Sequence, residues 1–550
     1  MTRRAADLLI DCLSAHDVDR IFCVPGESYL AALDALFERN TIQTVICRHE
    51  GGAGFAALAD AKLTRRPGVA FVSRGPGATN ASIAVHVAEQ DATPLVLFIG
   101  QVARHEAGRK AFQEVDYAKT FSDMAKAVWT INDADRLPDI VAKAFQVAAA
   151  ATPGACVVVL PEDMLEDMTA SAVMGPAQSP QVGVGDDAQL SVIAKMLDDA
   201  KRPLIIAGGA LNAPEGRAAL QAACNTHQVP CALTFKRQDL FDNTSALYAG
   251  HLGFKVPRPL VDRLNEADLI LAVGTRLGEV STQGYTFPRA PEPDQPLIHI
   301  YDDAAPLNRE YRTRLSLVAD PTAVMAALAQ RTAGQHPGDR AAWIERLHAP
   351  MKASRAWSAR PDGRLDMGPV VAALTSTARD DAIFITDAGN FSGWLHRYFP
   401  FNGRHRLLGT VGGAMGLGMP AAVAAGLRCP GTQVITFIGD GGMGMSGAEL
   451  ATAVQYDVPV KVFISNNASY GTIRMHQENA FKGRVVGTAL KNPDYAALAE
   501  AHGARGFTLA TIDEAESVVA AALAQDGPVV VDVKTDVHLI SPNATLDDLG

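Results

Sequence analysis

The sequence predicts an α/β protein built from three doubly wound parallel-sheet domains. Short apolar and β-branched runs alternate with helical patterns in three blocks, and strands separated by helices form parallel sheets. Two stretches between the blocks, 176–190 and 331–365, have the Pro, Gly and polar composition of linkers. The 550 residues also exceed what one hydrophobic core can organise. We therefore predict domains at 1–175, 190–332 and 366–550.

The composition is that of a folded protein with no nucleic-acid or membrane partner. Apolar residues make up 48% of the chain, which is typical of globular proteins. The 49 Lys and Arg are outnumbered by 60 Asp and Glu and form no basic cluster, which argues against binding to nucleic acid or anionic membranes. The seven cysteines are scattered without CxxC pairs, and no apolar run resembles a signal peptide or membrane span. We expect a cytoplasmic protein with free thiols.

The first block contains predicted strands at 21–24, 44–47, 68–73, 95–99 and 156–160. Glu50 follows the second of these strands and opens a helix through two glycines, which by itself is a favourable charge at a helix N-terminus. Arg74 precedes a Gly-Pro-Gly turn, and its cation would bind a substrate carboxylate or face solvent. Gln113 by itself reads as a surface residue.

The second block has predicted strands at 203–207, 269–273 and 297–300. Glycine turns follow strands at 208–209, 250–253 and 274–276. The G-x-G-x-x-G phosphate fingerprint is missing, so neither a flavin nor a nicotinamide site can be derived from these residues.

The third block carries the most specific pattern. After a strand at 382–386 and its turn at 387–391, the strand 434–438 meets Gly439-Asp440-Gly441-Gly442, and the strand 458–464 ends at Asn466-Asn467. The S-x-x-E spacing of Ser446 and Glu449 predicts a helix that starts at Ser446 after a glycine loop. Asp440 and Asn467 then lie at one edge of a parallel sheet, where their oxygens suit Mg²⁺ shared with a diphosphate.

Gly-Asp-Gly followed at this distance by Asn-Asn closely resembles the diphosphate-binding motif of thiamine diphosphate (ThDP) enzymes, although each half alone is an ordinary turn. The segments at 75–77, 100–102 and 111–114 follow in the order found in acetohydroxyacid (acetolactate) synthases. The chain is therefore identified as a member of the ThDP-dependent acetolactate synthase-like family, which includes pyruvate decarboxylases. The resemblance implies a pyrimidine-binding domain, a middle domain and a diphosphate-binding domain, in this order.

The resemblance also implies roles for individual residues. Mg²⁺ would be held by Asp440, Asn467 and the carbonyl of Ser469. Glu50 would hydrogen-bond the aminopyrimidine ring and help to remove the thiazolium proton, Gln113 would reach the active site, and Met415 would separate the two cofactor rings. The implied cofactor-binding residues are Glu50, Gly389, Asn390, Phe391, Gly413, Met415, Gly439, Asp440, Gly441, Gly442, Asn467, Tyr470 and Gly471.

Substrate contacts are less specific than cofactor contacts. Arg74 departs from the small polar residue expected before Gly-Pro-Gly, and His476 stands where synthases have a tryptophan that shapes the pocket for the second 2-oxoacid. His476 is a candidate for pocket lining or acid–base chemistry, or is a surface residue. Arg474 is a candidate carboxylate clamp. Middle domains of this family carry FAD or lack it, and the sequence leaves both open.

The implied activity is that of a ThDP- and Mg²⁺-dependent carboligase, which decarboxylates a 2-oxoacid donor and condenses it with a second carbonyl compound. The alternatives are a 2-oxoacid decarboxylase, a 2-hydroxyacyl or 2-hydroxyketone carbon–carbon lyase, and a non-catalytic ThDP-binding paralogue. Within one subunit of this family, the domains that carry Glu50 and Asp440 do not face each other across the site. The resemblance therefore implies a homodimer at minimum, with a homotetramer expected.

Overall fold

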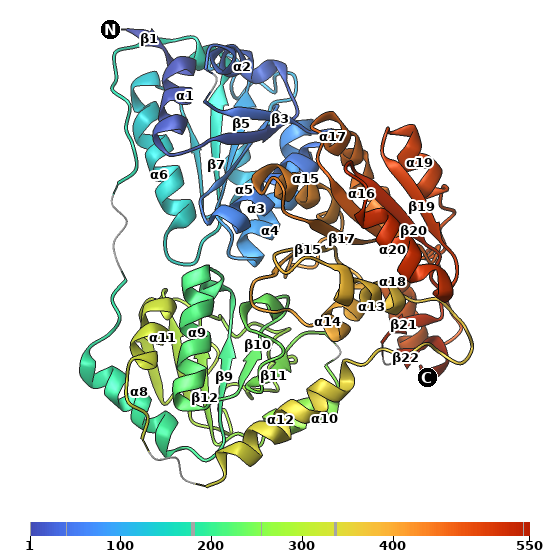
Figure 1. The fold of residues 1–550 in the computed structure, drawn as a ribbon. Helices are drawn as coiled ribbons and strands as arrows, with labels where there is room; N and C mark the ends of the chain where they lie inside the picture. Colours follow the sequence, from blue (N-terminus) through green and yellow to red (C-terminus); the bar gives the residue numbers. More distant parts are fainter. Residues whose placement is uncertain are drawn as a thin grey trace.

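The computed structural model describes residues 2–39, 41–177, 182–254, 256–334, 338–542 and 544–549, which form three α/β domains (Figure 1). In this part of the chain, each domain contains a parallel sheet of six strands. The predicted fold class is confirmed. The predicted domain limits stay a prediction, and each sheet lies within one of them.

The N-terminal domain has the strand order β3-β2-β4-β5-β7-β6. The predicted strands are present, but β6 was missed because it is short and only half-buried. The strands are β2 (Arg20–Cys23), β3 (Gln43–Ile46), β4 (Gly68–Val72), β5 (Leu95–Gln101), β6 (Ala127–Thr130) and β7 (Ala155–Pro161), and the short β1 (Arg3–Arg4) pairs with β8 (Met168–Thr169). The helices are α1 (Ala5–Ala15), α2 (Leu30–Phe37), α3 (Glu50–Thr64), α4 (Pro76–Gln90), α5 (Tyr117–Phe121), α6 (Leu137–Ala149) and α7 (Glu162–Leu165).

The middle domain has the order β11-β10-β9-β12-β13-β14. Its strands are β9 (Pro203–Ala207), β10 (Cys231–Leu233), β11 (Tyr248–His251), β12 (Leu269–Val273), β13 (Leu297–Tyr301) and β14 (Leu315–Val318). Its helices are α8 (Asp187–Asp199), α9 (Pro214–His227), α10 (Arg258–Leu264), α11 (Pro321–Ala329) and α12 (Arg340–Ser354).

Helix α12 lies inside the stretch 331–365, so the prediction of a linker is wrong for the centre of that stretch. Trp343 and Leu347 of α12 are buried in the core of the middle domain, and the Trp343 indole N–H donates to the carbonyl of Pro203 at 2.9 Å. The sequence did not predict this helix because its few buried apolar residues stand among many charged ones and form no clear helical pattern. The other predicted linker is 176–190. Its residues 178–181 lie outside the described residues, and its last residues, from Asp187 on, belong to α8.

The C-terminal domain has the order β16-β15-β17-β18-β20-β19. Its strands are β15 (Ile383–Thr386), β16 (Arg406–Gly409), β17 (Val434–Gly439), β18 (Val460–Ser465), β19 (Arg505–Leu509) and β20 (Val529–Val533), and β21 (Leu539–Ser541) pairs with β22 (Ala544–Thr545). Its helices are α13 (Gly368–Thr377), α14 (Ser392–Tyr398), α15 (Gly418–Arg428), α16 (Asp440–Ser446), α17 (Leu450–Gln455), α18 (Gly471–Ala480), α19 (Tyr495–Ala501) and α20 (Ala515–Leu523). Counted from the first strand of each sheet, the order is the same as in the N-terminal domain.

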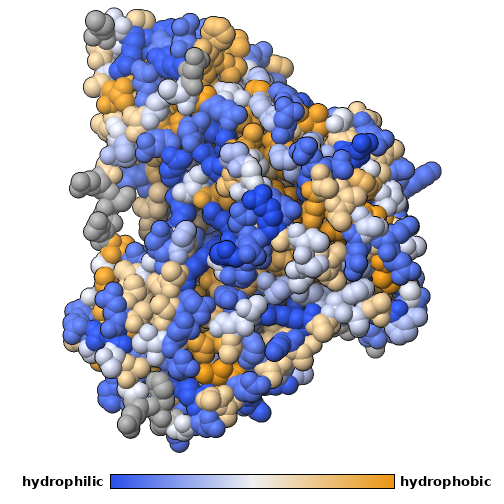
Figure 2. Space-filling view, viewed as in Figure 1, coloured by the Kyte–Doolittle hydropathy of each residue, from blue (hydrophilic) through white to orange (hydrophobic). Residues whose placement is uncertain are grey.

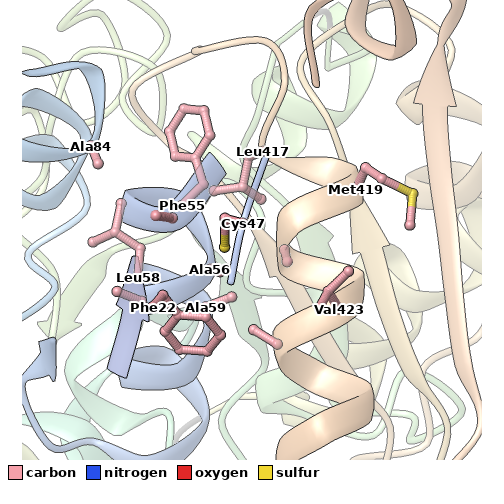
Figure 3. Close-up of a cluster of buried hydrophobic side chains, with 14 of the residues drawn as sticks. Phe22, Cys47, Phe55, Ala56, Leu58, Ala59, Ala84, Leu417, Met419 and Val423 are labelled. Carbon is pink, nitrogen blue, oxygen red and sulfur yellow. The ribbon is translucent and has the colours of Figure 1, made fainter. Parts of the chain in front are cut away.

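The N-terminal and C-terminal domains share one hydrophobic core. Helix α3 packs against α15, and Figure 3 shows side chains of both helices, among them Phe55, Leu58 and Val423, in one buried cluster. A partly buried ion pair at 2.7 Å joins Asp60 of α3 to Arg428 of α15. Within the subunit, the relative placement of these two domains is therefore fixed by packing.

The surface and the cysteines agree with the composition. The face in Figure 2 is mostly polar, with apolar residues in separate patches. None of the helices in the described ranges is long and apolar enough to cross a membrane. All seven cysteines are unpaired, as predicted.

Candidate active site

A cavity of about 1060 Å³ lies at the carboxyl ends of β15 to β18 and is bounded on another side by the middle domain. The direction in which successive strands are added to the sheet changes between β15 and β17. Open α/β sheets bind ligands at the carboxyl ends of the strands beside such a switch point. Many of the residues predicted from the sequence line this cavity. They are Gly389, Asn390, Phe391, Gly413, Met415, Gly439, Asp440, Gly441, Gly442, Asn467, Ser469, Tyr470, Gly471 and His476.

The predicted metal ligands converge on one backbone amide. The Ser469 N–H donates both to Asp440 Oδ2 at 3.2 Å and to Asn467 Oδ1 at 3.1 Å. Asp440 is buried, and this burial raises the pKa of its carboxyl, against hydrogen bonds that favour the charged form. One of these bonds comes from Asn492 at 2.8 Å, a residue that the sequence motifs did not indicate.

The oxygens at this place fit a magnesium ion. They comprise a carboxylate, a side-chain amide oxygen and the nearby Ser469 carbonyl, which are hard ligands that leave positions for a diphosphate. In the described ranges, no group of three or more His, Cys, Asp or Glu side chains is arranged to hold a metal. The mixed oxygen set is the candidate site for Mg²⁺ because of its own ligand chemistry.

The glycines after β17 lie in a helix, so the predicted loop before Ser446 is wrong. Helix α16 begins directly at Asp440. A Cβ added at Gly441 would lie 2.6 Å from the Tyr470 ring, and one at Gly442 would lie 2.6 Å from Asp387 Oδ2. Glycine is a poor helix former, but here it lets α16 approach the neighbouring turns closely.

The predicted capping box of Ser446 and Glu449 is also wrong. Ser446 makes no side-chain cap, whereas Glu449 Oε1 accepts the backbone N–H groups of Arg48 at 2.9 Å and His49 at 3.1 Å. Burial raises the pKa of the Glu449 carboxyl, and hydrogen bonds from Thr452 and these amides oppose that shift. Glu449 therefore holds the start of α3, directly before Glu50, from another domain.

Replacing Glu449 by Ala is expected to lower the free energy of unfolding by about 3 kcal/mol, because two backbone N–H groups lose a charged, buried acceptor. Urea unfolding followed by circular dichroism measures the change. Glu500→Ala, at an exposed site on α19, is the matched control and should change stability little. Equal effects of the two substitutions would contradict the role of Glu449.

Glu50 and Gln113 lie on a different surface from Asp440 and do not line the cavity. Glu50 Oε2 accepts a hydrogen bond from Asn80 Nδ2 at 2.9 Å. Both residues contact the Gly-Pro-Gly turn at 75–77: a Cβ at Gly77 would lie 3.3 Å from Glu50 Oε1, and one at Gly75 would lie 2.8 Å from the Gln113 carbonyl. The turn thus places both predicted catalytic residues on one part of the N-terminal domain.

The candidate substrate residues are placed in three different ways. Arg74 is buried in ion pairs with Glu27 at 3.1 Å and Glu162 at 2.7 Å, so it does not face solvent, and this pairing does not support substrate binding. Arg474 is half-buried in α18 and does not line the cavity. His476, in the same helix, is exposed and lines it.

Comparison with known proteins gives matches over all three domains. The description "Thiamine pyrophosphate enzyme" applies to an N-terminal TPP binding domain at residues 3–120, a central domain at 190–328 and a C-terminal TPP binding domain at 387–533. An acetolactate synthase large subunit of Parasynechococcus marenigrum is 31% identical over 97% of this chain and 87% of its own length. The acetolactate synthase isozyme 2 large subunit of Escherichia coli is 29% identical over 96% and 95% of the two chains. A putative thiamine pyrophosphate-containing protein of Bacillus subtilis is 29% identical over 96% and 91%.

Proposed function

We propose that this chain, which belongs to the thiamine pyrophosphate enzymes and within them to the acetolactate synthase-like family, is a ThDP- and Mg²⁺-dependent carboligase. Its substrates are a 2-oxoacid donor, which loses CO₂, and a second carbonyl compound. The observation that carries the proposal is the convergence of Asp440 and Asn467 on the Ser469 amide, inside a cavity lined by closely packed glycines. Plain decarboxylation and carbon–carbon lysis remain the alternative reactions of the same site. Retention of Glu50, Asp440 and Asn467 argues against a non-catalytic paralogue.

The chain's own residues have separate tasks in this proposal. Asp440, Asn467 and the Ser469 carbonyl hold Mg²⁺, and the turn at 389–391 borders the space for a diphosphate. Met415 lines the cavity with an apolar side chain, and its methyl group would lie 3.1 Å from a Cβ added at Gly441. When bound, ThDP supplies a nucleophilic carbon and accepts the electrons released with CO₂. Glu50 holds a proton at the pyrimidine ring, on which the reactivity of that carbon depends.

We further propose that each site forms between two subunits. Glu50 does not line the cavity of its own subunit, and the packing of α3 against α15 joins the two domains that carry Glu50 and Asp440. Both observations support a site in which a second copy brings Glu50 to Asp440. Apolar side chains are exposed beside both parts of the proposed site. They are Phe112, next to Gln113, Met445 in α16, and Ile473, which lines the cavity. A homodimer is then the minimum unit, and a homotetramer is the proposed assembly.

A mixture of two inactive variants tests the shared site. In a mixed dimer of Glu50→Gln and Asp440→Ala subunits, one site carries both substitutions and the other carries neither. After subunits are exchanged at equal concentration, half of the dimers are mixed and each has one intact site, so about a quarter of the wild-type activity should return. Mixing Glu50→Gln with itself is the control. Activity that stays at the level of the single variants after verified exchange would contradict an intersubunit site.

The reaction itself is tested by an NMR time course of the protein with ThDP, Mg²⁺ and pyruvate. Acetolactate, acetoin and acetaldehyde are followed together. Acetolactate supports carboligation despite His476, acetaldehyde alone supports the decarboxylase alternative, and the absence of any product directs the search to other 2-oxoacids.

The proposal includes no flavin. In the glycine turn at 208–209, a Cβ at Gly208 would lie 2.5 Å from Thr275 Cβ and 2.6 Å from the Gly274 carbonyl. Close packing between the turns after β9 and β12 therefore accounts for this glycine without a ligand. The visible absorbance spectrum of the purified protein tests for FAD.

A further inference from the structure

Three basic side chains line the middle-domain side of the same cavity. Lys236 follows β10, His251 is the last residue of β11, and His396 lies in α14 of the C-terminal domain. The two imidazole rings are 6.1 Å apart, centre to centre. No sequence motif indicated these residues, and the proposed reaction has not used them.

Lys236 is a buried cation without a direct counter-ion. It is 2% exposed, and its Nζ lies 3.5 Å from the carbonyl oxygen of Thr386 and 3.3 Å from that of Asp387. Among the described residues it forms no ion pair. A buried charge normally requires a partner of opposite sign, so this side chain is poised to receive an anion.

The charged groups around Lys236 do not supply that partner. The Asp387 carboxylate accepts two backbone N–H groups, and Asp91 pairs with Lys62. Burial lowers the pKa of Lys236 to about 8; Asp387 and Asp91 counter this, while Lys62 and Arg237 add to it. At neutral pH the ammonium group is therefore largely charged.

The two histidines add neutral donors. His396 is 9% exposed, and neither of its ring nitrogens has a hydrogen-bond partner in the described part of the chain. Burial, with further contributions from Lys236 and His251, lowers the pKa of His396 well below its usual range. Burial and the charge of Arg355 lower the pKa of His251 to about 4. Each neutral imidazole keeps one N–H, and buried polar groups in native proteins rarely lack partners.

We propose that Lys236, His251 and His396 form a subsite for a substrate carboxylate, namely the carboxylate that the reaction does not remove. The inference rests on the proposed function and deepens it. Lys236 lies at the ends of β15 and β16, whereas Asp440 and Asn467 follow β17 and β18 in the same sheet. Two strand spacings separate β15 from β18, or about 10 Å. A small oxoacid held at Lys236 would therefore share one cavity with the cofactor.

Two sources would supply such a carboxylate. A dicarboxylic 2-oxoacid donor loses one carboxylate as CO₂ and keeps the other. A monocarboxylic donor keeps none, and the carboxylate then belongs to a 2-oxoacid acceptor.

Binding of succinate, an unreactive dicarboxylate, tests the subsite without turnover. Calorimetry on the protein with ThDP and Mg²⁺ should show at least tenfold weaker binding for Lys236→Met, because a charge-assisted hydrogen bond is lost. Wild-type affinity should fall as pH rises through about 8, where Lys236 loses its proton, and this fall should be missing in the variant. His396→Phe is a second variant, also expected to weaken binding, which serves if Lys236→Met does not fold.

Lys461→Met is the matched control. Lys461 is also buried, and burial also lowers its pKa to about 8. Its ammonium group donates to the Gly527 carbonyl at 2.8 Å, and the residue does not line the cavity. Succinate affinity should be unchanged in this variant. Equal succinate affinity in the wild type and in folded Lys236→Met would overturn the proposal.

Release of CO₂ from 2-oxoglutarate and from pyruvate distinguishes the two sources. If Lys236→Met raises the KM for 2-oxoglutarate alone, the carboxylate belongs to the donor. If the variant releases CO₂ from pyruvate normally but no longer joins it to a second oxoacid, the carboxylate belongs to the acceptor. If no oxoacid reacts while succinate binding still depends on Lys236, the proposed function fails and the anion subsite stands.

Discussion

Replacing Glu50 by Gln is expected to lower turnover by about 10²- to 10⁴-fold while ThDP affinity stays nearly the same. Glutamine has almost the same shape as glutamate and can keep a hydrogen bond to the pyrimidine ring, but it cannot exchange a proton with it. Glu50 is only partly exposed and is held by Asn80, so the substitution should leave the start of α3 in place. Steady-state product formation and calorimetric titration with ThDP measure the two quantities.

Glu166→Gln is the control for this substitution, because Glu166 is an exposed residue of the same domain that does not line the cavity. It should leave both turnover and cofactor affinity unchanged. Normal turnover in Glu50→Gln would remove Glu50 from the proton-transfer role. A large loss of ThDP affinity would assign it to binding instead.

Removing the Asp440 carboxylate is expected to weaken Mg²⁺-dependent ThDP binding by about 100-fold or more, because Asp440 is the only acid in the proposed ligand set. Its oxygens also accept hydrogen bonds from Gly441, Ser469 and Asn492, which Asp440→Ala would leave without an acceptor. Asp440→Asn keeps the shape and removes the charge, so it isolates the metal contribution. Calorimetric titration with ThDP at several Mg²⁺ concentrations measures the effect.

Asp513→Asn, at an exposed position of the same domain, is the control and should bind ThDP as the wild type does. If Asp440→Asn also retains wild-type affinity with the same dependence on Mg²⁺, Asp440 is not a metal ligand. The same variant should abolish turnover when cofactor is limiting and recover part of it at high Mg²⁺ and ThDP.

The sequence could indicate that the residues on the Asp440 side lie close together because that side is local. Asp440 and Asn467 follow β17 and β18, which are consecutive strands joined by helices, and parallel pairing brings their carboxyl ends together. The strands themselves were recognisable as apolar runs bounded by glycine and polar turns. Burial on both faces leaves such strands little alternative to an apolar composition.

Long-range contacts explain what the sequence did not predict. Glu449 has the spacing of a helix cap, yet its carboxylate is taken by amides of another domain about 400 residues earlier. Lys236 and His396 come from segments far apart in the chain, and no local pattern relates them. Each of these side chains is buried only because the domains pack together, and a local sequence motif cannot predict that packing.

The core shared by α3 and α15 also has a consequence for synthesis on the ribosome. Phe55 and Leu58 of α3 emerge early, but their partners on α15 follow more than 350 residues later. At about 5–20 residues per second, the apolar face of α3 waits roughly 20–70 s for its partner. During that interval the apolar face of α3 lacks its partner, so the nascent chain should be most prone to aggregation until the C-terminal sheet is complete.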